Sequence, residues 1–343
     1  MKIKTLVLNA VAMVVLAASP LVAADPTVET VIDGLYNPCA VAVQPDTGVV
    51  FVSDSGAGRV IRVVDGKAQD VIVGFAKDVY GKGPKFDIGP LGLVFLDKDT
   101  LVVGGGDYPD GDELLRVFSV PAAGSPAIKA SDATGSFKMP ATGDVKGEGN
   151  FYGLAATETA IFVTCNGDDT KGWISRAAIQ KGKVTEFKRF LATKEATEVD
   201  APIAATIRIS LSPEKPDLLV IGQGGEVTVP EDALLTFYDV KTGKMLLNLE
   251  TGLYDITGLA YSADSKKLFA TDFAWMKTTE GGLFQLISTD DNGKQSVEAK
   301  KLVSLDKPTA LAIQGDTIYV TVFGTPAEGS DAKTGKLVKV TVK

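Results

Sequence analysis

Short apolar segments alternate with polar turns along this chain of 343 residues, and one arrangement of them occurs six times. Each copy contains an apolar strand, a tight turn, a second apolar strand, a polar loop and a third strand. Equivalent positions lie 50 to 61 residues apart, at Ala40, Gly92, Gly153, Arg208, Gly258 and Ala310. A strand-rich repeat of this length is typical of β-propellers, in which each copy forms one blade. We therefore predict an all-β fold, a single six-bladed β-propeller with four antiparallel strands per blade.

Turn residues separate the strands, as the first copy shows. The segment Gln44-Pro45-Asp46-Thr47-Gly48 supplies a fixed φ at proline and a positive φ at glycine, and Asp65-Gly66-Lys67 suits a tight hairpin. The first strand of each copy is almost entirely apolar, which fits an inner strand that is buried on both faces. The strands predicted for this copy cover residues 39–43, 49–53, 59–64 and 68–73.

The two ends of the chain complement each other. The last copy stops after its third strand, at residues 336–342, whereas residues 27–32 look like a fourth strand without a blade. We predict that residues 27–32 pair with residues 336–342, which closes the ring and covers a free sheet edge.

The long connections of the repeats fall on one face of the predicted ring. Propeller geometry places the loops between the fourth and first strands, and between the second and third strands, on the same side. Loops collected on one side of a rigid scaffold are typical of a working face. These long connections cover residues 76–89, 104–112, 138–150, 193–206, 223–232, 273–281 and 323–333.

The amino terminus has the composition of a secretory signal peptide. Lys2 and Lys4 precede an apolar stretch, and small residues end with Ala23 and Ala24. We expect residues 1–24 to be removed, residues 25–343 to form the propeller, and the protein to be exported to the periplasm or secreted.

Composition excludes several classes of function. The formal net charge is −8, with 43 acidic and 35 basic residues, and no basic cluster suggests a nucleic-acid partner. After the leader, no apolar stretch is long enough for a membrane span. The chain has no histidine, which excludes Ser-His-Asp and Cys-His catalysis and most zinc and copper sites. We expect a monomer.

Two cysteines, Cys39 and Cys165, lie in the first and third copies. Blades one and three are not neighbours in a ring, and a disulfide needs Cα atoms within about 7 Å. We therefore expect two partly buried thiols rather than a bond.

The repeated units resemble a known group of proteins. "Pro-x-x-Leu/Val-Ala-Val", "Pro-Asp-x-Gly-x-Val/Leu-Phe/Tyr-Val-Ser/Thr-Asp" and "Gly-x-Val-x-Arg-Val" are similar to segments of the NHL and gluconolactonase-like (SMP-30 type) six-bladed propellers. The resemblance implies the fold, and it includes sugar-lactone hydrolases with a calcium ion in the central channel as well as propellers that only bind. The positions it suggests for metal ligands are Asn37, Asp54, Asp107, Asn150, Asn166, Asp255 and Asp272.

Two interpretations remain open for these oxygen-bearing side chains. Calcium prefers six to eight oxygen ligands, and Asp54, Asp107, Asn166 and Asp272 form the candidate metal set. The alternative is that each side chain caps a turn by accepting hydrogen bonds from nearby backbone amides. The acidic loop at residues 106–113 is either a second calcium site or a solvated turn.

Aromatic side chains in the long loops suggest a ligand surface. The candidate ligand-binding residues, which could stack on a sugar or anchor a partner, are Tyr108, Tyr152, Phe273, Trp275 and Phe323. They could equally pack beneath their own loops. We therefore predict an exported binding propeller that holds a protein, peptide or carbohydrate at its loop face. The alternative is a calcium-dependent lactone or ester hydrolase that uses a channel metal.

Overall fold

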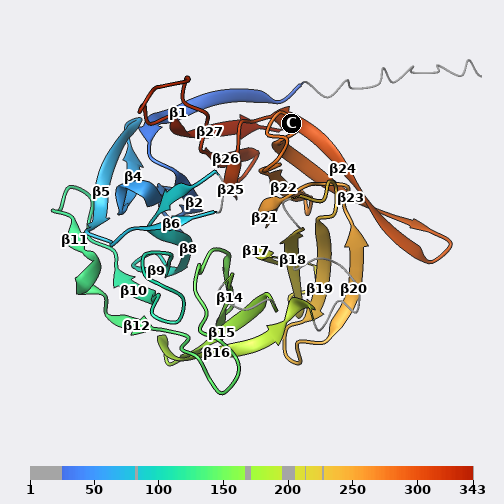
Figure 1. Ribbon diagram of the computed structural model, residues 1–343, viewed down its shortest axis with the longest axis horizontal. Helices are drawn as coiled ribbons and strands as arrows, with labels where there is room; N and C mark the ends of the chain where they lie inside the picture. Colours follow the sequence, from blue (N-terminus) through green and yellow to red (C-terminus); the bar gives the residue numbers. More distant parts are fainter. Residues whose placement is uncertain are drawn as a thin grey trace, which may run out of the picture.

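The computed structural model describes residues 25–81, 84–166, 171–194, 205–212, 214–225 and 228–342. Six sheets surround a central axis, and the inner strand of each faces the centre of the ring (Figure 1). The predicted all-β, six-bladed fold is confirmed. The predicted leader, residues 1–24, lies outside the described residues. Within the described part, no helix is both long and apolar enough to cross a membrane.

The blades follow the six sequence copies in order. From the axis outward, blade 1 contains β2 (Pro38–Val43), β3 (Val50–Asp54), β4 (Arg59–Val64) and β5 (Lys67–Val73). Blade 2 contains β8 (Pro90–Asp97), β9 (Thr100–Gly105), β10 (Leu115–Ser119) and β12 (Gly135–Phe137). Blade 3 contains β13 (Leu154–Ala156), β14 (Ala160–Thr164), β15 (Trp173–Gln180) and β16 (Lys183–Ala192).

The second half of the ring repeats this order. Blade 4 contains β17 (Ala205–Leu211), β18 (Leu218–Gly224), β19 (Leu234–Asp239) and β20 (Met245–Glu250). Blade 5 contains β21 (Ile256–Tyr261), β22 (Leu268–Asp272), β23 (Gly282–Asp291) and β24 (Lys294–Ser304). Blade 6 contains β25 (Pro308–Gln314), β26 (Thr317–Val322) and β27 (Gly335–Thr341), and β1 (Thr27–Leu35) lies outside β27.

The first and last described strands pair with each other. β1 runs antiparallel to β27, with Val28 opposite Val340 and Thr30 opposite Val338. Glu29 also forms an ion pair of 2.9 Å with Lys339. The sixth sheet is therefore built from both ends of the described chain.

One connection is longer than the sequence suggested. The turn between the third and fourth strands is tight in most blades, but in blade 2 it covers residues 120–134, with β11 (Ile128–Lys129) and the 3-10 turn η2 (Ala130–Asp132). β11 adds to the outer edge of blade 1, parallel to β5. Arg62 of blade 1 donates to the carbonyls of Pro121 and Ala122 at 2.9 and 2.8 Å. The expectation that the long connections all lie on one face is therefore wrong for blade 2, and blade 1 gains a fifth strand.

Hydroxyl groups hold the inner strands of adjacent blades together. Ser53 accepts the amide N–H of Ala40 at 2.8 Å and donates to the carbonyl of Leu91 in the next blade at 2.7 Å. Thr257 donates to Pro308 O at 2.7 Å across the seam between blades 5 and 6. These short, buried bonds fix the inner strands that carry the loops of the working face.

Candidate functional site

A small hairpin covers the mouth of the channel on the loop face. It is formed by β6 (Asp78–Tyr80) and β7 (Phe86–Ile88) in the connection from blade 1 to blade 2, whereas the 3-10 turn η1 (Ser55–Ala57) lies between β3 and β4 of blade 1. Figure 1 shows β6 on the inner side of the ring, close to β2 and β8. The sequence predicted only a long loop here.

The hairpin packs on aromatic residues from blades 5 and 6. The ring centroid of Phe86 lies 5.3 Å from that of Trp275 and 5.2 Å from that of Phe323. Phe273 stacks on Trp275 at 5.0 Å. We call the apolar group formed by these residues the mouth cluster, and it consists of Cys39, Tyr80, Phe86, Ile88, Leu91, Tyr152, Phe273, Trp275 and Phe323.

Four of the five predicted ligand-binding residues therefore belong to the mouth cluster. Phe273 and Phe323 are 3% and 7% exposed, so they pack within the protein instead of presenting a free surface. Trp275 is half-buried, and Tyr152 donates from its hydroxyl to the carbonyl of Thr309 at 2.6 Å. Tyr108 is separate and 41% exposed, beside the guanidinium of Arg116.

Polar contacts attach the hairpin to the ring. The carboxylate of Asp87 accepts the hydroxyl of Tyr36 at 2.5 Å, and its carbonyl accepts the amide of Asn37 at 3.0 Å. The amide of Asn166 donates to the hydroxyl of Tyr80 at 2.7 Å. The hydrogen bond to Asp87 is the main reason that the pKa of Tyr36 is raised to about 12. Asn37 and Asn166, both suggested as metal ligands, thus hold the hairpin.

Asp54 and Asp107 occupy equivalent places at the ends of the second strands of blades 1 and 2, and each is paired with an arginine. Asp54 is 1% exposed, accepts the Tyr36 N–H at 2.6 Å, and lies 2.7 Å from the guanidinium of Arg59. Asp107 is 2% exposed and accepts two bonds, of 3.2 and 2.9 Å, from Arg116. Both carboxylates are therefore engaged by positive charge, which a calcium ion would have to displace.

Asp272 serves as a backbone cap. One of its oxygens accepts the amide N–H of Tyr254 at 3.0 Å, and the other accepts those of Asp255 and Ala274 at 2.7 and 3.0 Å. The carboxylate fixes the loop that carries Phe273 and Trp275, so the capping interpretation accounts for this residue.

The predicted calcium set does not assemble around one point. In the described part of the chain, no three Asp, Glu or Cys side chains gather into a group that could hold a metal ion. Asp54, Asp107 and Asp272 are engaged by arginine or by backbone amides, and Asn166 holds Tyr80. Calcium at the mouth does not fit this donor set, and we derive no chemistry through it.

Asp255 differs from these three carboxylates. One of its oxygens accepts the amide N–H of Trp275 at 2.7 Å, and the other receives no hydrogen bond from the described residues. The side chain is in a residue only 8% exposed, and burial, helped by the charges of Asp272 and Asp232, raises its pKa to about 6. A carboxyl with a pKa near neutrality and an unengaged oxygen can exchange protons with a ligand or a water molecule.

The acidic loop at residues 106–113 is organised around a buried acid. Glu113 is 1% exposed and accepts the amide N–H of Asn150, which lies in the left-handed region at φ 48°. Burial raises the pKa of Glu113 to about 9, and the nearby Asp110 contributes in the same direction. Asp112 instead pairs with Lys138 at the surface, at 2.9 Å. The loop is thus held from within by a buried acid and at its surface by an ion pair.

The cysteines are free thiols, as the sequence predicted, and both are buried. Cys39 belongs to the mouth cluster, whereas Cys165 donates to the hydroxyl of Ser175 at 3.3 Å. Burial raises the pKa of Cys165, which keeps this thiol protonated and unreactive.

Similarity to known proteins is confined to structure. No family model matches the chain, and no curated protein matches it in sequence. Among solved structures, the PQQ-bound aldose sugar dehydrogenase of Streptomyces coelicolor is 12% identical, with a TM-score of 0.58 over 93% of this chain and 99% of that chain. A gluconolactonase of Xanthomonas campestris is 13% identical, with a TM-score of 0.54 over 94% and 91% of the two chains. A glucose dehydrogenase is 16% identical, with a TM-score of 0.59 over 92% and 100%.

At these identities the similarities show the fold and nothing further. They support the resemblance to gluconolactonase-like propellers at the level of architecture. Function therefore has to be argued from the residues of this chain.

Proposed function

We propose that this protein is an exported propeller enzyme that hydrolyses a small lactone or ester of a sugar at the mouth of its channel, with Asp255 as the general base. One observation carries the proposal: Asp255 combines a pKa of about 6 with a carboxylate oxygen that no described residue engages. The comparable carboxylates Asp54 and Asp107 are paired with arginines, which leaves them structural roles.

The chemistry needs only a base and a water molecule. The free oxygen of Asp255 accepts a proton from water as the water oxygen bonds to the carbonyl carbon. The ester carbon–oxygen bond then breaks, and the leaving alkoxide takes the proton back from Asp255. The products are a carboxylic acid and an alcohol. General-base catalysis of this type contributes roughly 10²- to 10⁴-fold to the rate.

The names of the structural neighbours support the choice of substrate class. They are a gluconolactonase and dehydrogenases of aldose sugars and glucose, so sugars and sugar lactones recur among propellers of this shape. This support is indirect, because a fold hosts many functions.

Substrate access requires movement of the β6–β7 hairpin. Tyr80 contacts Trp275 with ring centroids 6.1 Å apart, and Trp275 in turn donates its backbone amide to Asp255. The charge of Asp255 also acts on the hydroxyl of Tyr80. The aromatic cover excludes bulk water from the carboxyl and strengthens its interactions with a bound ligand.

The test is a comparison of Asp255→Asn with Asp46→Asn. The second variant changes an exposed aspartate in the turn between β2 and β3, on the opposite face. With glucono-δ-lactone and 4-nitrophenyl acetate as substrates, we expect Asp255→Asn to lose about 100-fold in rate and Asp46→Asn to lose nothing. Equal rates for Asp255→Asn and the unmodified protein would exclude Asp255 as the base.

A second candidate is binding without catalysis, as the sequence first suggested. Four exposed apolar side chains lie on the loop-face connections, namely Val79, Tyr108, Val229 and Met276, and Met276 is 61% exposed. If the protein hydrolyses no lactone or ester but retains a saccharide on a glycan array, with Tyr108→Ala/Met276→Ala weakening retention, this candidate replaces the first.

We also propose that residues 1–24 are a cleaved leader. The support is the charged, then apolar, then small-residue pattern of the segment. The mass of the protein recovered from the periplasm or medium of a bacterial host tests this, since cleavage yields a chain beginning at Asp25. Retention of the full-length chain in the cytoplasm would contradict it.

A further inference from the structure

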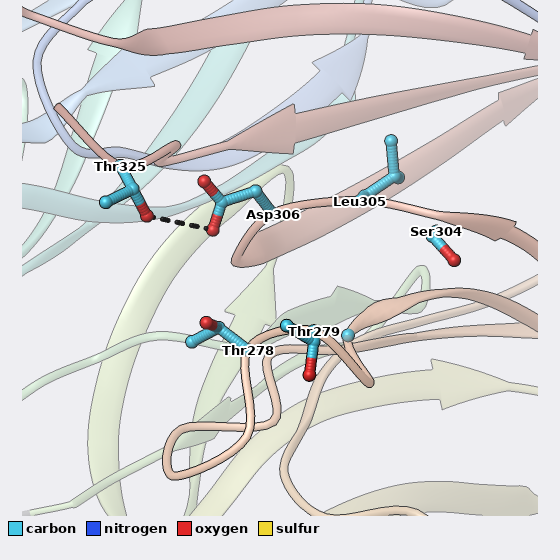
Figure 2. Close-up of a pocket in the computed structure, with 7 residues that line it drawn as sticks. Thr278, Thr279, Ser304, Leu305, Asp306 and Thr325 are labelled. Carbon is cyan, nitrogen blue, oxygen red and sulfur yellow. Dashed lines mark hydrogen bonds between the residues drawn. The ribbon is translucent and has the colours of Figure 1, made fainter. Parts of the chain in front are cut away.

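A pocket of about 380 Å³ lies at the seam between blades 5 and 6 (Figure 2). Thr278, Thr279 and Gly281 of the β22–β23 connection form one wall, residues 304–306 form the opposite wall, and Thr325 closes one end. The volume falls within the range of small-ligand sites. Because Thr325 follows β26 and Thr278 follows β22, the pocket belongs to the loop face.

Hydroxyl groups dominate its lining. Thr278, Thr279 and Ser304 border the pocket, and none of their hydroxyls forms a hydrogen bond with another group of the described chain. A hydroxyl both donates and accepts, and so does each hydroxyl of a sugar. The hydroxyls of the lining can therefore both donate hydrogen bonds to a ligand and accept hydrogen bonds from it.

The charge at the pocket is compensated. Asp306 accepts the hydroxyl of Thr325 at 3.1 Å, as the dashed line in Figure 2 marks, and lies 3.5 Å from the ammonium group of Lys307. Lys307 also donates to the carbonyl of Gly324 at 3.3 Å. Asp306 and Lys307 together therefore leave little net charge at the pocket. Leu305 also borders the pocket but is buried, at 9% exposed.

We propose that this seam pocket binds a neutral polyhydroxylated molecule, a single sugar unit. The site is distinct from the mouth, because the β22–β23 connection separates them. Phe273 and Trp275 lie on its mouth side in the mouth cluster, and Thr278 and Thr279 lie on its seam side. The proposal does not rest on the proposed function and stands whether or not Asp255 catalyses a reaction.

Saturation-transfer NMR with methyl α-D-glucoside, a sugar without a lactone or ester bond, tests the proposal. We expect transfer to the unmodified protein and a dissociation constant in the millimolar range, typical of a few hydrogen bonds on an open surface. Thr279→Val/Ser304→Ala should weaken binding by roughly four- to 100-fold, since the loss of each of the two hydrogen bonds weakens binding by about two- to ten-fold. Thr289→Val, which removes an exposed hydroxyl from the distant β23 strand, is the matched control and should leave binding unchanged.

Two further measurements separate binding at the seam pocket from binding at the mouth and from electrostatic binding. Asp255→Asn should bind the glucoside as the unmodified protein does, and raising the salt concentration should have little effect on a neutral ligand. Absence of transfer, equal binding by Thr279→Val/Ser304→Ala, or loss of binding in Asp255→Asn would each overturn the seam site. Melting temperatures within a degree or so of the unmodified protein ensure that the variants are folded.

Discussion

The hydroxyl of Tyr152, just before β13 of blade 3, donates a 2.6 Å hydrogen bond to the carbonyl of Thr309, in β25 of blade 6. Blades 3 and 6 are opposite each other in a ring of six, so this bond crosses the axis of the propeller. The phenol of Tyr152, a member of the mouth cluster, thus lies in the channel. Thr309 is held in turn by a 2.6 Å bond from its own hydroxyl to the carbonyl of Pro38 in blade 1.

We predict that Tyr152→Phe lowers the free energy of unfolding by about 1–2 kcal/mol. The substitution keeps the ring and leaves the buried Thr309 carbonyl without this donor, which costs about that much. Urea titration measures the effect. Tyr319→Phe is the matched control, because its hydroxyl makes no hydrogen bond within the described chain, and it should change stability little. Equal stability of the two variants would mean that the bond across the axis contributes nothing.

The sequence predicted the scaffold because its signals are local. Turn residues such as Gly48 and Gly66, both at positive φ near 70°, lie where the pattern places tight turns. The hairpin was missed because β6 and β7 have three residues each and no alternating pattern of their own. Its strands form by packing on Trp275 and Phe323, which lie about 190 or more residues further along the sequence. Patterns of neighbouring residues in the sequence do not reveal contacts between residues so far apart.

The contacts of the candidate metal ligands were predictable only in part. Asp54 is followed by Arg59 and Asp107 by Arg116, in both cases at the start of the third strand of the blade. The recurrence of an acid and an arginine at equivalent places in two blades is a sequence signal for ion pairing. The free oxygen and raised pKa of Asp255 depend on burial by several loops, which the sequence does not reveal.

The stability of the protein should depend on pH through Asp255. The pKa of its carboxyl is raised from 3.8 to about 6, so the folded protein holds this proton more tightly than the unfolded chain does. The Asp255 carboxyl therefore contributes most to the free energy of unfolding below pH 4. This contribution, about 3 kcal/mol, is lost as the pH rises through about 6. Urea titrations at several pH values should show Asp255→Asn gaining stability relative to the unmodified protein across this window. A difference that stays constant between pH 4 and 7 would contradict the raised pKa.

The same group sets the pH dependence of the proposed reaction. A general base acts in its ionised form, so the rate of ester hydrolysis should rise with pH and level off above about pH 6. Initial rates of 4-nitrophenyl acetate hydrolysis, corrected for the uncatalysed reaction, give the profile. A rate that is flat from pH 4 to 8 would show that a group other than Asp255 limits the reaction.

Phe86 should control the closure of the mouth. Phe86→Ala removes ring contacts to Phe273, Trp275 and Phe323, and loss of a partly buried ring costs about 2–3 kcal/mol. The hairpin then opens more often, because the hydrogen bonds of Asp87 and Tyr80 remain but much of its apolar attachment to blades 5 and 6 is lost. In a Trp173→Phe background, acrylamide quenching of Trp275 fluorescence should increase. Val79→Ala, an exposed change in the same hairpin, should leave quenching unchanged, and an identical response of both variants would show that Phe86 does not hold the cover.

Removal of residues 25–33 should lower the melting temperature by roughly 10 °C or more. The deletion takes most of β1 from the sheet of blade 6 and leaves β27 with an open edge. It also removes Ile32, 7% exposed, from the core shared with Leu337. If the deletion variant has the same melting temperature as the unmodified protein, the ring is stable without this strand.

Calcium should not stabilise the protein. Asp54 and Asp107 are paired with Arg59 and Arg116, and Asp272 is engaged by backbone amides. A site with a dissociation constant of about 10 μM would add almost 3 kcal/mol at 1 mM calcium, which raises a melting temperature by several degrees. We expect a shift of less than about 1 °C, measured with and without chelator. A chelator-reversible rise would contradict this, and its loss in Glu113→Gln but not in Asp54→Asn would assign the ion to the acidic loop and not to the mouth.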